Sequence, residues 1–188
     1  MLSVIIATLD SERALVPTLA ALVPGATAGL VSEVIIADGG STDDTAAVAD
    51  VAGCNFLRTE GALGERLQAA AAAARAPWLL FLRPGTVLDT PWIREVGAFL
   101  ERGSPGMQAA VFQRGLPPQG GVREALAMLG RALFAKPQPE QGLLVAKDAY
   151  RRLGGHSEAA ADPEAEFLRR IGRRQIAVLR TRAFPPNT

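Results

Sequence analysis

The sequence has almost no residues that could form a covalent or metal-bound scaffold. Among 188 residues there is one cysteine, Cys54, and one histidine, His156. This excludes an internal disulfide framework and gives little support for a zinc site. A lone cysteine fits a reducing cytosol, so we expect a cytoplasmic protein. Stability must therefore come from a hydrophobic core, and the chain is long enough to bury one in a single domain.

An excess of one charge and a long hydrophobic run are also absent. The 20 basic side chains are balanced by 19 acidic ones, which excludes the strong overall field of many nucleic-acid and membrane-surface binders. No apolar run reaches the roughly 18 residues of a membrane span, and the longest is broken by Arg75 and Pro77. The first residues favour a strand over a signal peptide. We expect a soluble protein with no nucleic-acid partner and no integral membrane segment.

Short apolar runs alternate with helical segments in the first half of the chain. Pro17 is expected to open or kink the first helix, and Ser41 with Asp44 resembles a capping box. This alternation predicts an α/β fold with a mostly parallel central sheet and helices on both faces. The runs expected to be strands are residues 4–7, 33–37, 54–60 and 78–82, and the expected helices are residues 11–25, 42–53, 64–76 and 92–103.

The second half continues the alternation with weaker signals. Its amphipathic stretch at 122–137 favours core packing over membrane anchoring. A short strand, a short helix and a glycine stop are expected within 137–158. The other expected elements are a strand at 107–116, a surface turn at 117–121, a helix at 163–174 and a final strand at 175–184.

The stretch EVIIADGGSTDDT, residues 33–45, carries the strongest chemical signal. A strand ending in Asp38, followed by two glycines and a helix start, places a carboxylate beside backbone that a ligand can approach closely. Such a carboxylate can accept hydrogen bonds from a ribose or a base. The alternative, that Asp38 only orders the turn, is equally compatible with the spacing. The G-x-G-x-x-G fingerprint is missing after the first strand, which disfavours an ordinary dinucleotide-binding fold.

Four motifs in order resemble the family 2 inverting glycosyltransferases of GT-A fold: SVIIATLDSE, EVIIADGGSTDDT, APWLLFLRPGT and LGGHSE. More narrowly, these motifs resemble the small bacterial branch associated with radical-SAM and selenocysteine domains. It implies one Rossmann-like domain over residues 1–188, with a nucleotide-binding half at 1–100 and an acceptor-side half at 101–188. It also implies a nucleotide-sugar donor, UDP- or GDP-linked, and a divalent metal, Mg²⁺ or Mn²⁺.

The resemblance assigns a nucleotide pocket to the first two strand ends. Thr8 and Asp38 line this pocket in the family, and Gly39 and Ser41 follow Asp38 in the same turn. Gln68 stands where the family usually has asparagine, in the alanine-rich helix beside the donor. These five residues are the nucleotide-binding candidates at this end of the sheet.

The family's Asp-x-Asp metal motif falls on Arg83-Pro84-Gly85, so both metal-binding carboxylates are missing. An arginine there could pair directly with phosphate oxygens, because its planar guanidinium matches their geometry. That would give a metal-independent transferase. The alternative is that Arg83 is solvated or ion-paired in a relative that has lost catalysis and serves as a nucleotide-binding, regulatory or scaffold protein.

The family's catalytic base lies in a Glu-Asp pair that reads Ala161-Asp162 here. The resemblance therefore makes Asp162 the candidate base, with Glu164 and Glu158 as nearby substitutes. Asp162 could also cap the helix ahead of Pro163, and one residue can do both. His156 is expected to pack on the acceptor side rather than transfer protons. Donor sugar, acceptor and oligomeric state stay open.

Overall fold

The computed structural model describes residues 1–102, 107–115 and 136–185. The surface turn expected at 117–121 and nearly all of the amphipathic helix expected at 122–137 lie outside these residues. The other expected strands and helices fall within them, except for residues 103 and 116 at the ends of two of these elements.

The described strands form one mixed sheet. The four strands at one end, β3, β2, β1 and β4, are parallel, and β7 is antiparallel to both of its neighbours. β6 and β8 are parallel to each other, and β5 is antiparallel to β8. This confirms the expected α/β class with a mostly parallel sheet. In spatial order the strands are β3 (Asn55–Arg58), β2 (Val31–Asp38), β1 (Leu2–Thr8), β4 (Trp78–Leu82), β7 (Leu143–Ala146), β6 (Ala109–Arg114), β8 (Ile176–Phe184) and β5 (Val87–Leu88).

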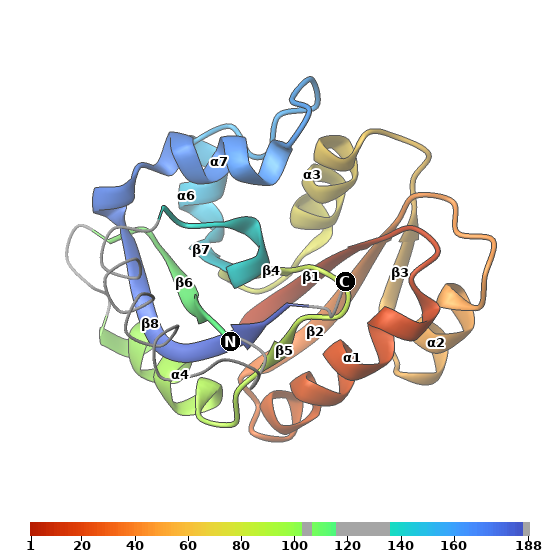
Figure 1. Ribbon diagram of the computed structural model, residues 1–188, viewed down its shortest axis with the longest axis horizontal. Coiled ribbons are helices and arrows are strands. Elements are labelled where there is room, and N and C mark those ends of the chain that lie inside the picture. The colour runs from red at the N-terminus through yellow and green to blue at the C-terminus, as the bar shows by residue number, and fades with distance from the viewer. Residues whose placement is uncertain (103–106, 116–135, 186–188) are drawn as a thin grey trace, which may run out of the picture.

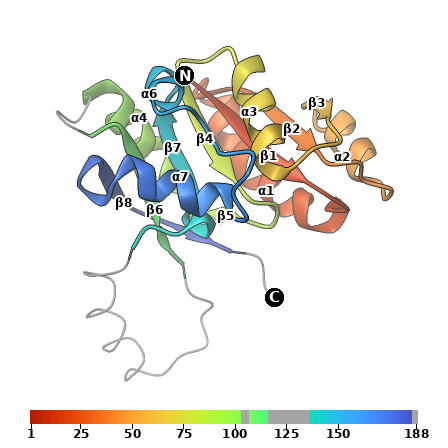
Figure 2. The ribbon, with the colours of Figure 1, turned by 90° about the horizontal axis from the view of Figure 1, so that it is seen from above.

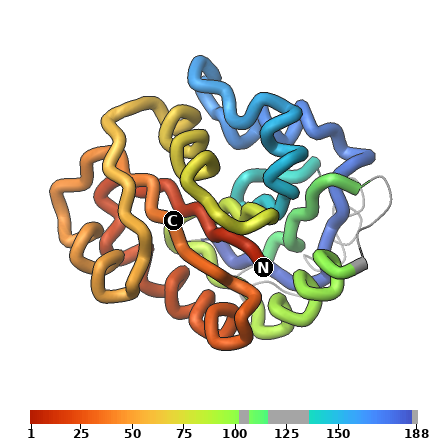
Figure 3. Tube along the Cα trace, turned by 180° about the vertical axis from the view of Figure 1, so that it is seen from behind, coloured from red at the N-terminus to blue at the C-terminus, as the bar shows by residue number. Residues whose placement is uncertain are grey.

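Helices cover both faces of the sheet, as expected (Figure 1). One layer is formed by α1 (Glu12–Thr27), α2 (Thr45–Val51) and α4 (Trp92–Arg102), and the other by α3 (Leu63–Ala73), α6 (Lys147–Arg152) and α7 (Pro163–Ile171). Figure 2 looks onto the second layer, and Figure 3 shows both layers from behind. Within the described part of the chain, no helix is long and apolar enough to cross a bilayer.

Each layer of helices packs against its own apolar side of the sheet. Alternate strand residues divide between the two faces, so Val4 and Ile6 of β1 pack with the α1 layer while Ile5 packs with the α3 layer. Both sets of side chains are almost fully buried. The sheet is therefore rigid on both sides, which fixes the positions of the loops at its carboxyl ends.

The structure corrects two local expectations for helix starts. The first helix begins at Glu12 and continues through Pro17, so this proline does not open the helix, and a kink at Pro17 stays a prediction. The second begins at Thr45, with Asp44 at the N-cap and no side-chain cap bond, so Ser41 and Asp44 form no capping box. The physical reason is that the Ser41 hydroxyl bonds to Asp38 instead.

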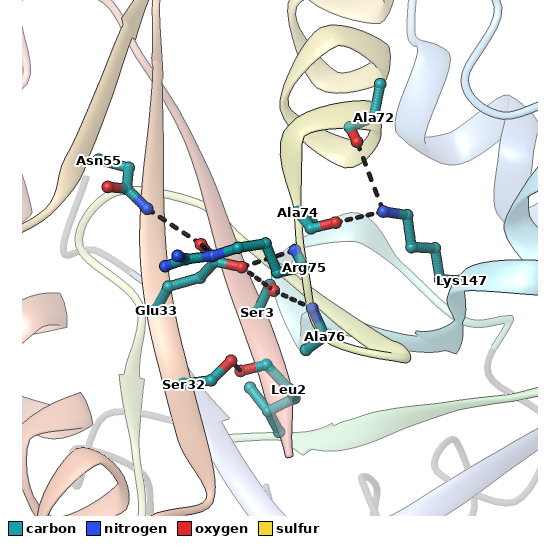
Figure 4. A network of polar contacts seen from close by, with 10 residues as sticks. All are labelled: Leu2, Ser3, Ser32, Glu33, Asn55, Ala72, Ala74, Arg75, Ala76 and Lys147. Atoms are coloured by element: carbon teal, nitrogen blue, oxygen red, sulfur yellow. Dashed lines mark hydrogen bonds and ion pairs between the residues drawn. The ribbon is translucent and has the colours of Figure 1, made fainter.

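A polar network ties together the amino ends of the parallel strands (Figure 4). Glu33 of β2 accepts hydrogen bonds from the Ser3 hydroxyl at 2.6 Å, the Arg75 backbone N–H at 2.7 Å and the Asn55 amide at 3.0 Å. The Lys147 ammonium bonds to the Ala72 and Ala74 carbonyls at the end of α3. These contacts join β1, β2, β3, α3 and α6 at the edge opposite the candidate site described below.

Candidate functional site

The candidate site lies where β1, β2 and β4 end. In this part of the sheet the spatial order of strands reverses their sequence order between β1 and β4, which is where open α/β sheets bind ligands. Thr8 and Asp38, the last residues of β1 and β2, are directly paired. Arg83 follows the last residue of β4. The structure thus brings these three predicted site residues to one edge.

The loops after β1 and β2 are held together by reciprocal hydrogen bonds. The Asp10 backbone N–H donates to the Ser41 hydroxyl at 2.9 Å, and the Asp10 carboxylate accepts from the Thr42 N–H at 2.7 Å. Asp10 has a φ of 46° and Gly40 a φ of 99°, both in the left-handed region. The two loops therefore form one rigid wall at this edge.

Asp38 is the centre of that wall. One carboxylate oxygen accepts from the Thr8 and Ser41 hydroxyls, and the other accepts from the Gly40 and Ser41 N–H groups at 2.9 and 2.8 Å. Asp38 is fully buried. Burial opposes its ionisation, but the hydrogen bonds from Ser41, Thr8 and Gly40 outweigh burial and lower its pKa. All four lone-pair positions are used within the protein, so these contacts order the turn.

Arg66 of α3 also reaches this edge, and sequence reasoning missed it. Its terminal nitrogen donates to the Thr8 carbonyl at 2.8 Å and the Ala37 carbonyl at 3.3 Å. The guanidinium lies against Gly39, where an added Cβ would come within 2.6 Å of it. In the sequence, the only sign of this contact is the glycine at position 39, which leaves room for another group. A glycine alone does not reveal which distant residue fills that space.

Gln68 lies two residues beyond Arg66 in α3 and faces a different neighbour. Its amide donates to the His156 carbonyl at 2.5 Å, and its side chain lines a cavity of about 280 Å³ with Tyr150, Arg151 and Gly155. Gln68 therefore joins α3 to the loop before α7.

His156 belongs to a buried aromatic cluster. It packs with Phe81, Phe167 and Tyr150, and its Nδ1 lies 2.8 Å from the Tyr150 hydroxyl. Burial, with a smaller contribution from Arg170, lowers the pKa of His156 to about 3, and burial raises the pKa of Tyr150 to about 12. Both side chains are therefore uncharged near neutral pH, which suits packing.

Arg83 is held by two carboxylates from the second half of the chain. Its Nε donates to Glu164 at 2.7 Å, and a terminal nitrogen donates to Glu140 at 2.8 Å. Glu164 lies in the first turn of α7 and Glu140 in the short 3₁₀ helix η1 (Pro139–Gln141). The Arg83 side chain remains 34% exposed, whereas Glu164 is only 13% exposed. The place of the metal motif is thus occupied by an ion-paired cation.

Three carboxylates share the field of this one guanidinium. Burial opposes the charge of Arg83, but Glu164, Glu140 and Asp162 together raise its pKa. Burial raises the pKa of Glu164, helped by Asp162 and Glu140 and opposed by Arg83. Burial therefore favours the protonated form of Glu164, against the opposing charge of Arg83.

The structure places the three candidate base residues differently. Asp162 is exposed at the N-cap of α7, and one of its carboxylate oxygens accepts the Ala165 N–H at 3.0 Å. Glu158 is exposed on the preceding loop, whose backbone packs on Gly64 of α3. Glu164 is turned inward onto Arg83. Asp162 thus caps the helix and keeps one carboxylate oxygen without a described partner.

Residues 3–140 match the family described as Glycosyl transferase family 2. The chain belongs to this family. No curated protein matches the sequence. Among solved structures, the fold is similar to glucosyl-3-phosphoglycerate synthase from Mycobacterium tuberculosis in complex with phosphoglyceric acid, with a TM-score of 0.73, 21% identity, and coverage of 100% of this chain and 72% of that one. It is also similar to S. aureus TarS in complex with UDP-GlcNAc, with a TM-score of 0.74, 16% identity, and coverage of 100% and 58%.

The metal implied by the family does not fit the residues of this chain. One structure of the mycobacterial relative contains Mn²⁺ and uridine diphosphate. Divalent cations of this kind need oxygen ligands, but here an arginine stands at the motif and its guanidinium holds Glu140 and Glu164. In the described residues no three His, Cys, Asp or Glu side chains are grouped to hold a metal ion. We therefore derive no step through a metal.

Proposed function

We propose that this family 2 member is an inverting glycosyltransferase that takes a sugar from a UDP- or GDP-linked donor and passes it to a hydroxyl acceptor without a metal at Arg83-Pro84-Gly85. The nucleoside would lie at the ends of β1 and β2, beside Thr8, Asp38, Gly39 and Ser41. The acceptor would enter from the side of α7. The narrower likeness to the small bacterial branch of the family is part of this proposal.

The observation that carries the proposal is the position of Asp162. Its carboxylate is exposed, fixed by the helix cap, and close enough to Arg83 to act on its charge. In the proposed reaction Asp162 takes the proton of the acceptor hydroxyl. The hydroxyl oxygen then attacks the anomeric carbon, the bond from that carbon to the diphosphate breaks, and the nucleoside diphosphate leaves.

The other predicted residues have supporting parts in this proposal. Glu164 keeps Arg83 at the sheet edge, and Gln68 fixes the loop that precedes α7. Glu158 is the second exposed carboxylate near the start of α7, which makes it the substitute base to test. Arg83 stands at the sheet edge where the family's metal motif falls, with about a third of its side chain exposed.

Asp162→Asn tests the proposal directly. The amide still caps α7 but cannot accept a proton, so turnover should fall by about 100-fold or more with little change in donor affinity. The measurement is donor hydrolysis and transfer over a panel of UDP- and GDP-sugars and hydroxyl acceptors. The matched control is Asp148→Asn, which changes an 84% exposed carboxylate in the first turn of α6.

The second candidate is a non-catalytic nucleotide-binding relative, favoured by the missing metal carboxylates. It predicts nucleotide binding without turnover in the wild type. Equal turnover in Asp162→Asn and wild type would remove Asp162 as the base, and Glu158→Gln would then be the next variant to assay.

A further inference from the structure

The charge of Arg83 is already neutralised within the protein. Its guanidinium is bound to Glu164 and Glu140, and Asp162 lies within its field. Three carboxylates thus surround one cation. A diphosphate approaching this group meets no net positive charge, and in a half-buried site such an imbalance disfavours an anion. Donor binding by this protein therefore needs a second cation at the same edge.

Arg66 is a cation at this edge for which the described residues provide no carboxylate partner. Its hydrogen bonds go to two neutral carbonyls, those of Thr8 and Ala37. Among the described residues no Asp or Glu oxygen lies within 4.0 Å of it in an ion pair. Its positive charge is therefore not compensated by a direct contact.

One donor of Arg66 is also buried without an acceptor. The Nε atom is inaccessible and has no hydrogen-bond partner in the described part of the protein. A buried donor left in this way costs about 1–3 kcal/mol, and such groups call for a missing partner. One terminal nitrogen is taken by the two carbonyls, so Nε and the other terminal nitrogen remain. That edge of a guanidinium has the geometry to bind two oxygens of one phosphate, and such binding requires the atoms that cover Nε to move aside.

Gly39 keeps the guanidinium in this place. A Cβ at residue 39 would lie 2.6 Å from one terminal nitrogen of Arg66 and 2.9 Å from its Cζ. The next residue, Gly40, has a different requirement, since its φ is 99°. The two glycines after Asp38 thus serve separate purposes, and the first makes room for Arg66 at the ends of β1 and β2.

We propose that Arg66 binds the diphosphate of the donor and supplies the positive charge that Arg83 cannot. The proposal rests on the proposed function for the identity of its ligand. Arg83 then acts mainly as the bridge between β4, η1 and α7. The site takes a phosphate oxygen pair from the α3 side, at the point where β1 and β2 end.

The experiment is calorimetric titration of the full chain with inorganic pyrophosphate, UDP and uridine, all in EDTA. Arg66→Ala should weaken pyrophosphate and UDP binding about tenfold or more and leave uridine binding unchanged. Arg66→Lys keeps a charge but loses the paired donors, so it should lie between wild type and Arg66→Ala. Gly39→Ala should weaken the same two ligands by displacing the guanidinium. Because the displaced group is a flexible side-chain end, this variant should keep its fold.

Arg58→Ala is the matched control for overall charge. Arg58 ends β3 on the same edge, is exposed, and has no described side-chain partner. Equal losses in Arg58→Ala and Arg66→Ala would overturn the proposal, as would equal losses for uridine and UDP, or wild-type protein that binds neither phosphate ligand.

The outcomes for Arg66 and for the transferase reaction can be told apart. Arg66-dependent pyrophosphate binding without any sugar transfer would support the phosphate site and reject the reaction. Transfer activity, together with an Arg66→Ala variant whose UDP affinity equals that of the wild type, would support the reaction and reject Arg66 as the phosphate site.

Discussion

Asp38 shows how a residue can hold a site without offering a free atom to it. Both of its oxygens are occupied by donors from Thr8, Gly40 and Ser41. The side chain is therefore a fixed acceptor that sets the conformation of the turn. Hydrogen bonds to a ligand at this site must come from other residues. Any binding of a nucleoside by Asp38 would have to displace one of these four bonds.

Asp38→Asn should destabilise the fold at neutral pH by about 1–3 kcal/mol, because an amide cannot accept four hydrogen bonds and brings two donors of its own. The pKa of Asp38 is lowered in the folded protein. Its stabilising effect is therefore present above the unfolded value near 3.9 and is lost as pH falls through the lower folded value. Urea unfolding at pH 7 and pH 3 should show a difference between the two proteins that shrinks in acid.

Asp44→Asn is the control for this change. Asp44 is exposed, three residues from Ser41, and its side chain makes no cap bond. An equal loss of stability in both variants, or a difference that grows in acid, would contradict the account of Asp38.

At the scale of helices and strands, most of the fold was predictable because hydrophobic periodicity is local. The buried runs of β1, β2 and β4 and the helix α3 lie close to where the sequence predicts them. Helix starts were less predictable, because the Ser41 hydroxyl, which would accept a backbone N–H in a capping box, instead donates to Asp38 and accepts from the Asp10 N–H. Its bond to Asp38 depends on the pairing of β1 with β2, which short-range spacing does not show. The antiparallel direction of β7 was likewise not evident from the sequence.

The network around Glu33 should contribute to stability in a defined order (Figure 4). Glu33 is nearly buried and accepts from three residues, whereas the Arg75 side chain is 78% exposed. Glu33→Ala should cost about 1–3 kcal/mol. Arg75→Ala should cost less than about 1 kcal/mol, since it keeps its backbone N–H bond and loses only an exposed ion pair. Urea unfolding measures both.

Pyrophosphate binding should be unchanged in both variants under conditions where they are folded, because this network lies at the opposite edge of the sheet. A larger loss of stability from Arg75→Ala than from Glu33→Ala would show that the exposed ion pair, rather than the buried acceptor, holds the strands together.

In the molecule as a whole, the Arg83 cluster joins the two halves of the chain. Arg83 follows β4, while Glu140 and Glu164 come from η1 and α7, 57 and 81 residues further on. The sequence indicated that Arg83 replaces a metal-binding carboxylate and left open whether it is ion-paired. It could not identify Glu140 as a partner, because nothing local marks a contact over that separation. Arg66 was missed for the same reason.

Arg83→Asp should make the protein responsive to a divalent cation. The change removes the guanidinium and adds a fourth carboxylate to Glu140, Glu164 and Asp162, so without metal the cluster repels itself and the melting temperature should fall. Mn²⁺, which prefers oxygen ligands, should then raise the melting temperature of this variant by binding only the folded state. Wild-type protein should show no such rise, since the Arg83 guanidinium already supplies the positive charge at this position.

Arg83→Gln separates the two effects: it loses the guanidinium without gaining a ligand, so it should melt lower than wild type and recover less with Mn²⁺ than Arg83→Asp. Thermal unfolding of the three proteins in EDTA and in millimolar Mn²⁺ measures this. A rise in wild type as large as in Arg83→Asp would mean that a metal binds away from Arg83, and the metal-independent site proposed here would be wrong.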